Sequence, residues 1–278
     1  MADAVIKKPQ PKTGELLPVI GLGTWQVFDV GPSEAARESL RGVLREFVRL
    51  GGSVIDSSPM YGRSESVVGD LAAELDLQKR LFLATKVWTS GRESGIRQME
   101  ESFRRLRSAR LDLLQVHNLV DYRTHLATLR RWKEQGKVRY LGVTHYTSSA
   151  YDDLARVLAS EELDFVQLNY SLAERDAERR LLPLAMEKQI AVLANRPFAG
   201  GSLFRRVGSQ PLPAWAKDIG CATWAQFFLK FAISHPAVTC ALPATGKVHH
   251  LSDNMRAGFG PLPAPAIRKQ MAAYFTAL

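Results

Sequence analysis

The chain has 278 residues, of which 46% are hydrophobic and 23% are charged, a composition that indicates a globular protein and excludes a disordered or fibrous one. Its 37 Lys and Arg residues outnumber its 28 Asp and Glu residues, which gives a formal net charge of +9. The basic residues are spread through helix-like segments, so we expect solvated helix faces and no nucleic-acid partner. The length is compatible with one barrel or with two smaller domains.

Two cysteines, Cys221 and Cys240, are too few for a disulfide framework or a structural zinc site and therefore indicate a reducing compartment. The N-terminal stretch has no apolar segment of the kind found in signal peptides. No stretch approaches the roughly 18 consecutive apolar residues that a membrane-spanning helix needs. We expect a cytoplasmic protein that has no membrane partner.

Short apolar runs rich in β-branched residues recur along the chain and predict eight buried strands. They are residues 19–25, 53–56, 81–87, 113–117, 140–144, 165–168, 190–194 and 238–242. Helical periodicity between them is typical of right-handed βα units around a parallel sheet. No linker rich in Pro or Ser divides the sequence. We therefore predict an α/β fold, a single (β/α)8 TIM barrel that forms one domain over residues 1–278.

The segments around these strands are also informative. Apolar residues at helical spacing predict a helix within residues 91–110, and further helices are expected near residues 223–234 and 263–278. A turn signal at Thr13-Gly14 predicts a short N-terminal β-hairpin that covers the bottom of the barrel. The longest interval, before the eighth strand, predicts an extended loop of the kind that is usually functional.

Four ionisable residues stand at the ends of three consecutive predicted strands. Asp56 and Tyr61 follow the second strand, Lys86 lies at the end of the third, and His117 ends the fourth. Each has an ordinary structural explanation when taken singly, such as a turn cap or a core histidine. The carboxyl ends of barrel strands build the active-site face, so the four together predict one site there.

These residue types suit proton transfer to a carbonyl oxygen. A phenol with a pKa near 10 is a poor acid at neutral pH, and a neighbouring ammonium favours its ionised form. Asp56 would keep Lys86 charged and oriented, while a neutral His117 would position the carbonyl oxygen. We expect Tyr61 to protonate that oxygen while a hydride reaches the carbon.

The motifs around these residues resemble those of the aldo-keto reductase family in order and in spacing. They are residues 56–62 (Asp-Ser-Ser-Pro-Met-Tyr-Gly) with Ser64-Glu65, then Thr85-Lys86, residues 113–118 (Leu-Leu-Gln-Val-His-Asn) and residues 242–245 (Leu-Pro-Ala-Thr). The resemblance covers nearly the whole chain and implies a short member of bacterial type. It implies an NADP(H)-dependent oxidoreductase that reduces aldehydes or ketones to alcohols, with Tyr61 as proton donor.

The resemblance also implies a nicotinamide cofactor that extends across the barrel mouth. The positions expected to contact it are Gly23, Thr24, Trp25, Asp56, Thr144, His145, Gln167, Asn195, Arg196, Pro197, Phe198, Gly200, Gly201, Leu203, Thr245, Gly246, Lys247, His250, Asp253 and Asn254. Asn195 replaces a tyrosine that commonly stacks on the nicotinamide in the family. Ala244 and His250 replace a lysine and an arginine that often hold the 2′-phosphate. NADP(H) is therefore expected, and NAD(H) stays open.

Substrate contacts are expected from residues at the same strand ends. They are Trp25, Tyr61, Trp88, His117 and Asn118, with Phe204 and Trp215 of the long loop as further candidates. The short C-terminal segment predicts an open pocket for a small-molecule carbonyl compound. No metal is expected, because adjacent residues such as His249 and His250 diverge by about 100° on a helix.

Two other functions stay open on the sequence alone. One is a cofactor-binding regulatory protein on the same fold with little turnover, which Asn195, Ala244 and His250 favour weakly. The other is an aldolase that uses Lys86 as a Schiff base, which is disfavoured because Asp56 should keep that amine protonated. We expect a monomer or a weak homo-oligomer.

Overall fold

The computed structural model describes residues 4–278 and arranges their strands in two sheets. Strands β1 (Lys7–Pro9) and β2 (Leu16–Pro18) form an antiparallel hairpin. The other eight strands form one parallel sheet in chain order. They are β3 (Leu22–Gly23), β4 (Val54–Asp56), β5 (Phe82–Val87), β6 (Leu111–His117), β7 (Val138–His145), β8 (Phe165–Asn169), β9 (Ala191–Asn195) and β10 (Val238–Ala241).

The sheet closes on itself through the segment around β3. Parallel bridges join Ile20 to Ala241 and Gly23 to Ala244, and the amide of Gly21 donates to the carbonyl of Ala241 at 2.8 Å. A side chain at Gly21 would come within 2.9 Å of the Val54 carbonyl, so glycine permits this close approach. The predicted (β/α)8 barrel is confirmed, with a regular first strand shorter than residues 19–25.

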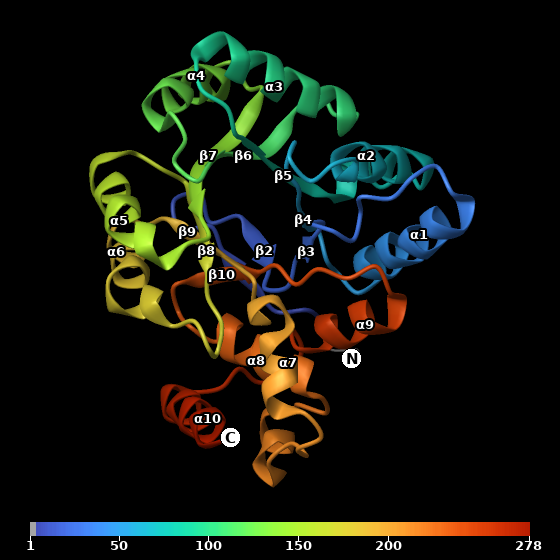
Figure 1. Cartoon of the computed structure of the whole chain (residues 1–278), viewed down its shortest axis with the longest axis vertical. Helices are drawn as coiled ribbons and strands as arrows, with labels where there is room; N and C mark the ends of the chain where they lie inside the picture. Colours follow the sequence, from blue (N-terminus) through green and yellow to red (C-terminus); the bar gives the residue numbers. More distant parts are fainter. Residues whose placement is uncertain (1–3) are drawn as a thin grey trace.

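Helices connect the strands and surround them (Figure 1). They are α1 (Glu34–Arg49), α2 (Ser64–Glu74), α3 (Arg92–Arg105), α4 (Tyr122–Glu134), α5 (Tyr151–Ser160), α6 (Leu181–Glu187), α7 (Ser202–Val207), α8 (Trp224–Ile233), α9 (Val248–Arg256) and α10 (Pro265–Ala277). The helices expected near residues 91–110, 223–234 and 263–278 are thus present. Between residues 4 and 278, none has the length and apolar character that crossing a bilayer requires.

Local chemistry sets two of these helix boundaries. Helix α8 begins after Thr223, whose side chain accepts a hydrogen bond from the amide of Gln226. Helix α3 ends earlier than residue 110 because Arg107 adopts a positive φ of 49°, and the amide of Ser108 then donates back to the carbonyl of Phe103.

The N-terminal hairpin covers the amino-terminal end of the barrel, as predicted. Lys8 Nζ donates to the carbonyls of Ile233, His235 and Val238, at 2.6–2.8 Å, just where β10 begins. Leu17 of β2 joins the apolar cluster inside the barrel, which includes Phe82, Tyr140 and Phe165. This end of the barrel is filled by packed side chains, which leaves the carboxyl ends of the strands for chemistry.

Candidate active site

The structure brings the four predicted catalytic residues together at the carboxyl ends of β4, β5 and β6. Lys86 Nζ donates to Asp56 Oδ2 and to the carbonyl of Ser57, both at 2.7 Å. The same nitrogen lies 5.1 Å from the centroid of the Tyr61 ring. The rings of Tyr61 and His117 meet edge to face, with their centroids 6.4 Å apart. A phenol, an ammonium and an imidazole therefore share one small space.

The loop between β4 and α2 sets the position of Tyr61. The amide of Tyr61 donates to the carbonyl of Ser58, and the carbonyl of Tyr61 accepts from the amide of Ser64 at the start of α2. Gly62 follows with a φ of 58°, and a Cβ there would come within 2.3 Å of the Asp29 carboxylate. Glycine is needed at this position both for its conformation and for the close approach.

Lys86 and Asp56 form a buried ion pair. Lys86 is fully buried and Asp56 is 5% exposed. Burial alone lowers the pKa of Lys86, but the charges of Asp56 and Tyr61 and their hydrogen bonds outweigh it, so the net direction is upward. The amine therefore stays protonated, which supports the sequence argument against a Schiff base at this residue.

The pKa of Tyr61 moves in the opposite direction to the sequence expectation. Burial raises it, the charge of Lys86 lowers it, and Asp56 raises it again, so the pKa ends above its ordinary value. The sequence argument was right about the influence of Lys86 and wrong about the net direction, because it did not include desolvation of the phenolate. Tyr61 consequently holds its proton throughout the neutral range.

His117 is neutral at physiological pH, as expected. Burial is the largest cause that lowers its pKa, and the nearby Lys86 and His145 lower it further, to about 3. Its Nδ1 has no hydrogen-bond partner among residues 4–278. The indole of Trp88 lies on its other side, with ring centroids 6.3 Å apart. A neutral imidazole can donate one hydrogen bond from its protonated nitrogen without competing as an acid.

The strand register places the residues expected at the nicotinamide next to His117. His117 pairs with Thr144 in β7, and Thr144 pairs with Gln167 in β8. The Nε2 of Gln167 and the Oδ1 of Asn195, which ends β9, are buried and have no partner among residues 4–278. One unsatisfied donor and one unsatisfied acceptor on adjacent strands fit the carboxamide of a nicotinamide.

His145 can contact the carboxamide of a nicotinamide only as a hydrogen-bond donor. Its Nδ1 accepts from the amide of Thr147 at 3.1 Å, and burial lowers its pKa, so the neutral ring carries its proton on Nε2.

Positive φ angles occur in the loop after β9, at Arg196, Ala199, Gly200 and Gly201. The amides of Ala199 and Gly201 donate to the carbonyls of Arg196 and Phe198, so these two N–H groups are used within the loop. Pro197 and Leu203 are buried and Phe198 is half-buried, so these three residues pack the loop against the barrel. Arg196 lies near Glu174, where its charge opposes the rise that burial causes in the pKa of that carboxyl.

Some of the predicted cofactor residues after β10 have exposed side chains, whereas others are buried or already form hydrogen bonds within the chain. Lys247, which precedes α9, and His250 are exposed, whereas Thr245 and Asn254 are buried. The Thr245 hydroxyl accepts from the amide of Lys247, which orders the turn at Gly246. Asp253, expected at the adenine, accepts from Thr223 and from Gln226 and so joins α9 to α8. Any contact between Asp253 and a cofactor would share its two oxygens with these bonds.

The aromatic residues expected to contact the substrate lie partly exposed after the strands of the barrel. Trp25 follows β3 with 50% exposure, and Trp88 follows β5 with 42% exposure. Asn118 follows β6 with a positive φ of 53°. The ring of Trp215, suggested as a further contact, packs against Phe227 and against Tyr274 of α10.

Phe204, the other residue suggested from the long loop, also packs against aromatic residues. Its ring contacts Phe198 and Phe228 of α8. The two aromatic residues of the long loop thus attach this loop to the outer helices.

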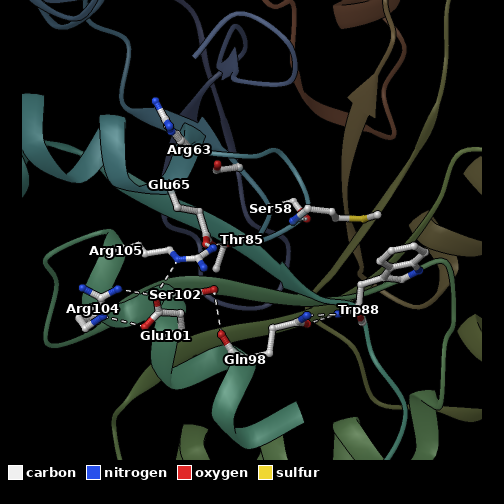
Figure 2. Close-up of polar contacts among 12 residues, drawn as sticks. Ser58, Arg63, Glu65, Thr85, Trp88, Gln98, Glu101, Ser102, Arg104 and Arg105 are labelled. Atoms are coloured by element: carbon white, nitrogen blue, oxygen red, sulfur yellow. Dashed lines mark hydrogen bonds and ion pairs between the residues drawn. The ribbon is translucent and has the colours of Figure 1, made fainter. Parts of the chain in front are cut away.

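Two polar residues near the site were not predicted from the sequence (Figure 2). Glu65 of α2 is fully buried, accepts from the Thr85 hydroxyl at 2.6 Å and lies 3.6 Å from an Arg105 nitrogen. Gln98 of α3 bonds to the backbone of Trp88. The acid of the Ser-Glu pair after the tyrosine motif was a visible signal for Glu65, whereas Gln98 had none.

A family model described as the Aldo/keto reductase family matches residues 19–272. The chain belongs to this family, which confirms the resemblance found in its motifs. It is 31% identical over 250 residues to methylglyoxal reductase YeaE of Escherichia coli (strain K12), over 86% of this chain and 84% of that protein. It is 28% identical over 242 residues to the NADH-specific methylglyoxal reductase of the same strain, over 76% of this chain and 73% of that protein.

A solved structure supports the same assignment. The aldo/keto reductase from Klebsiella pneumoniae in complex with NADP and acetate superimposes with a TM-score of 0.80 at 27% identity. The match covers 98% of this chain and 96% of that chain. The barrel and its connections are therefore shared over essentially their full length.

Proposed function

We propose that this chain is an NADP(H)-dependent reductase that converts aldehyde or ketone carbonyls to alcohols, with Tyr61 as the proton donor. The observation that carries the proposal is the fully buried Lys86 ammonium, held by Asp56 and directed at the Tyr61 ring. A buried cation beside a protonated phenol stabilises the phenolate as it forms. It does so at the carboxyl end of a barrel, where substrates bind.

In the proposed reaction, different residues of the chain donate the proton, position the substrate and hold the cofactor. Tyr61 holds its proton at neutral pH and delivers it to the carbonyl oxygen. Neutral His117 positions that oxygen, and Trp88 and Trp25 close the sides of the mouth. The dihydronicotinamide, when bound, supplies the hydride. Gln167 and Asn195 would hold its carboxamide, since each has a buried polar atom without a partner among residues 4–278.

The relatives narrow the substrate and the cofactor that we propose. Two of them are named methylglyoxal reductases, one of them NADH-specific, and a structural neighbour is in complex with NADP. We propose small aldehydes such as methylglyoxal as first substrates. NADP(H) is the proposed cofactor and NAD(H) the alternative, because exposed Ala244 and His250 replace the charged 2′-phosphate contacts.

The chain's compartment and assembly are further proposals. Both cysteines are buried and neither forms a disulfide, which fits a cytoplasmic enzyme. We propose that it acts as a monomer or a weak homo-oligomer. Sedimentation of the pure protein over a range of concentrations tests this second point.

The central test compares NADPH oxidation by the wild type, Tyr61→Phe and Tyr274→Phe with methylglyoxal as substrate. Tyr274 is a matched control on α10, where its ring packs against Trp215 and Trp224. It is not one of the four predicted catalytic residues. Tyr61→Phe should lose at least about 100-fold in kcat, since it lacks the acid. Tyr274→Phe should keep wild-type turnover. Equal turnover by the wild type and Tyr61→Phe would refute the mechanism.

Cofactor binding without turnover is a distinct outcome. If NADPH quenches tryptophan fluorescence stoichiometrically and no aldehyde or ketone is reduced, the reductase proposal fails. The chain would then be a cofactor-binding protein on the same fold.

A further inference from the structure

The backbone of Trp88 lies just beyond the end of the barrel sheet. The pairing of β5 with β6 ends at Val87, which is opposite Val116. A residue that leaves a sheet needs another partner for its N–H and its carbonyl oxygen. At Trp88, one side chain supplies both partners.

That side chain is Gln98 of α3 (Figure 2). The amide of Trp88 donates to Gln98 Oε1 at 2.6 Å, and Gln98 Nε2 donates to the carbonyl of Trp88 at 3.2 Å. A side-chain amide that pairs with both the N–H and the carbonyl of one residue takes the place of a partner residue on a neighbouring strand. It fixes the position and the orientation of the Trp88 backbone, from which the indole projects.

The residues that follow Trp88 are also held from the helices. His125 of α4 donates from Nε2 to the carbonyl of Thr89 at 2.6 Å, and Asp121 accepts from the amide of Gly91 at 2.8 Å. Helix α3 can approach His125 closely because Gly95 has no side chain, since a Cβ there would lie 2.3 Å from the imidazole. Gln98 is the member of this set that acts on the aromatic residue itself.

The indole of Trp88 links this contact to the proposed chemistry. Its ring lies 6.3 Å from the His117 ring, and 42% of the residue is exposed at the mouth. A large carbonyl compound held by Tyr61 and His117 would contact this indole, whereas a two- or three-carbon aldehyde would fit without it. A shift of the Trp88 backbone would therefore affect large substrates selectively.

We infer that Gln98 is a positioning residue that sets substrate preference by fixing the Trp88 indole beside His117. The inference rests on the proposed function for its kinetic consequence. The geometry on which it stands, two hydrogen bonds between the Gln98 side-chain amide and the backbone N–H and carbonyl of Trp88, does not depend on turnover.

The kinetic test uses Gln98→Met, which keeps the length of the side chain and loses both hydrogen bonds. Its KM for 4-nitrobenzaldehyde should rise about tenfold, and its KM for propanal should stay within about twofold of the wild type. The matched control is Gln270→Leu, a glutamine exposed on α10, which should change neither value. Equal rises in KM for both aldehydes, or no rise for either, would overturn the inference.

A double-variant comparison assigns the effect to the indole. In a Trp88→Ala background, Gln98→Met should leave the KM for 4-nitrobenzaldehyde unchanged, because the group that it positions is gone. If the full tenfold rise persists there, Gln98 acts by another route and the inference is wrong.

A spectroscopic readout separates failure of this inference from failure of the proposed function. Acrylamide quenching of tryptophan emission should be stronger in Gln98→Met than in the wild type, and this increase should vanish in a Trp88→Phe background. If the wild type reduces no carbonyl compound, the proposed function fails while this measurement still decides the role of Gln98. Unchanged quenching in Gln98→Met would refute the positioning role.

Discussion

Replacing Lys86 with methionine should damage stability and turnover for two separable reasons. The substitution keeps most of the volume of the side chain and removes the ammonium that donates to Asp56 and to Ser57. Turnover should fall at least about 100-fold because the Tyr61 phenolate loses its counter-charge. The stability effect comes from the carboxylate that is left behind.

The size of that effect follows from the surroundings of Asp56. The carboxylate is 5% exposed, and after the substitution Gln115 Nε2, at 3.4 Å, is the side-chain donor that still reaches it. Removing one partner of a buried ion pair costs about 3–5 kcal/mol. For a chain of this length we expect the Tm to fall by roughly 6–20 °C.

Urea unfolding followed by circular dichroism measures the loss, and a second substitution identifies its source. The double variant Lys86→Met/Asp56→Asn no longer contains a buried charge, so it should recover about 2 kcal/mol or more of the lost stability and still be inactive. If the single variant unfolds at the wild-type urea concentration, the ion pair does not contribute as argued. If the double variant is no more stable than the single one, the unpaired carboxylate is not the cause.

Three further outcomes are expected. The stability of the chain should fall below pH 6.5 by up to about 1.4 kcal/mol per pH unit through His117, because burial, Lys86 and His145 lower its folded pKa to about 3 and the unfolded chain takes up the proton first. His117→Gln should reduce this dependence in urea unfolding at pH 5 and pH 7, and His235, whose pKa burial lowers to about 4, should account for a further part of it. Thr85→Val removes the hydroxyl that donates to buried Glu65, so stability should fall by about 1–3 kcal/mol, and an unchanged Tm would contradict this. Ala244→Lys should favour NADPH over NADH by about tenfold in parallel titrations, whereas equal changes for both cofactors would show that position 244 does not face the 2′-phosphate.

The fold was accessible from the sequence because its strands are buried on both faces. The run over residues 190–194 is apolar throughout and that over residues 81–84 is apolar up to Thr85 and Lys86, while helical periodicity fills the intervals, which is typical of parallel barrels. The errors lie at boundaries. The end of α3 depends on the backbone conformation of Arg107, which has no signature in composition or in periodicity.

The sequence predicted which residues form the site but did not predict the burial and the packing around them. Strand ends placed Asp56, Lys86 and His117 together, because parallel strands end on one face. The aromatic packing of Phe204 and Trp215 against α8 and α10 was not predicted, since a loop sequence does not say which side of the loop meets the barrel. Gln98 stands beside the apolar stripe of α3, where a glutamine is typical of a solvated helix flank.

The raised pKa of Tyr61 shows why the environment matters for the proposed reaction. A proton donor must be protonated before substrate arrives, and a phenol is already protonated at neutral pH, with burial raising the pKa of Tyr61 further. The same burial would make the phenolate hard to form, were it not for Lys86 beneath it. Asp56 keeps that ammonium charged, although its own charge raises the pKa of the phenol further. A hydride that reaches the carbonyl carbon makes the oxygen basic, so the phenolate needs to be stabilised only at that moment, and a fixed buried cation does this without reorganisation.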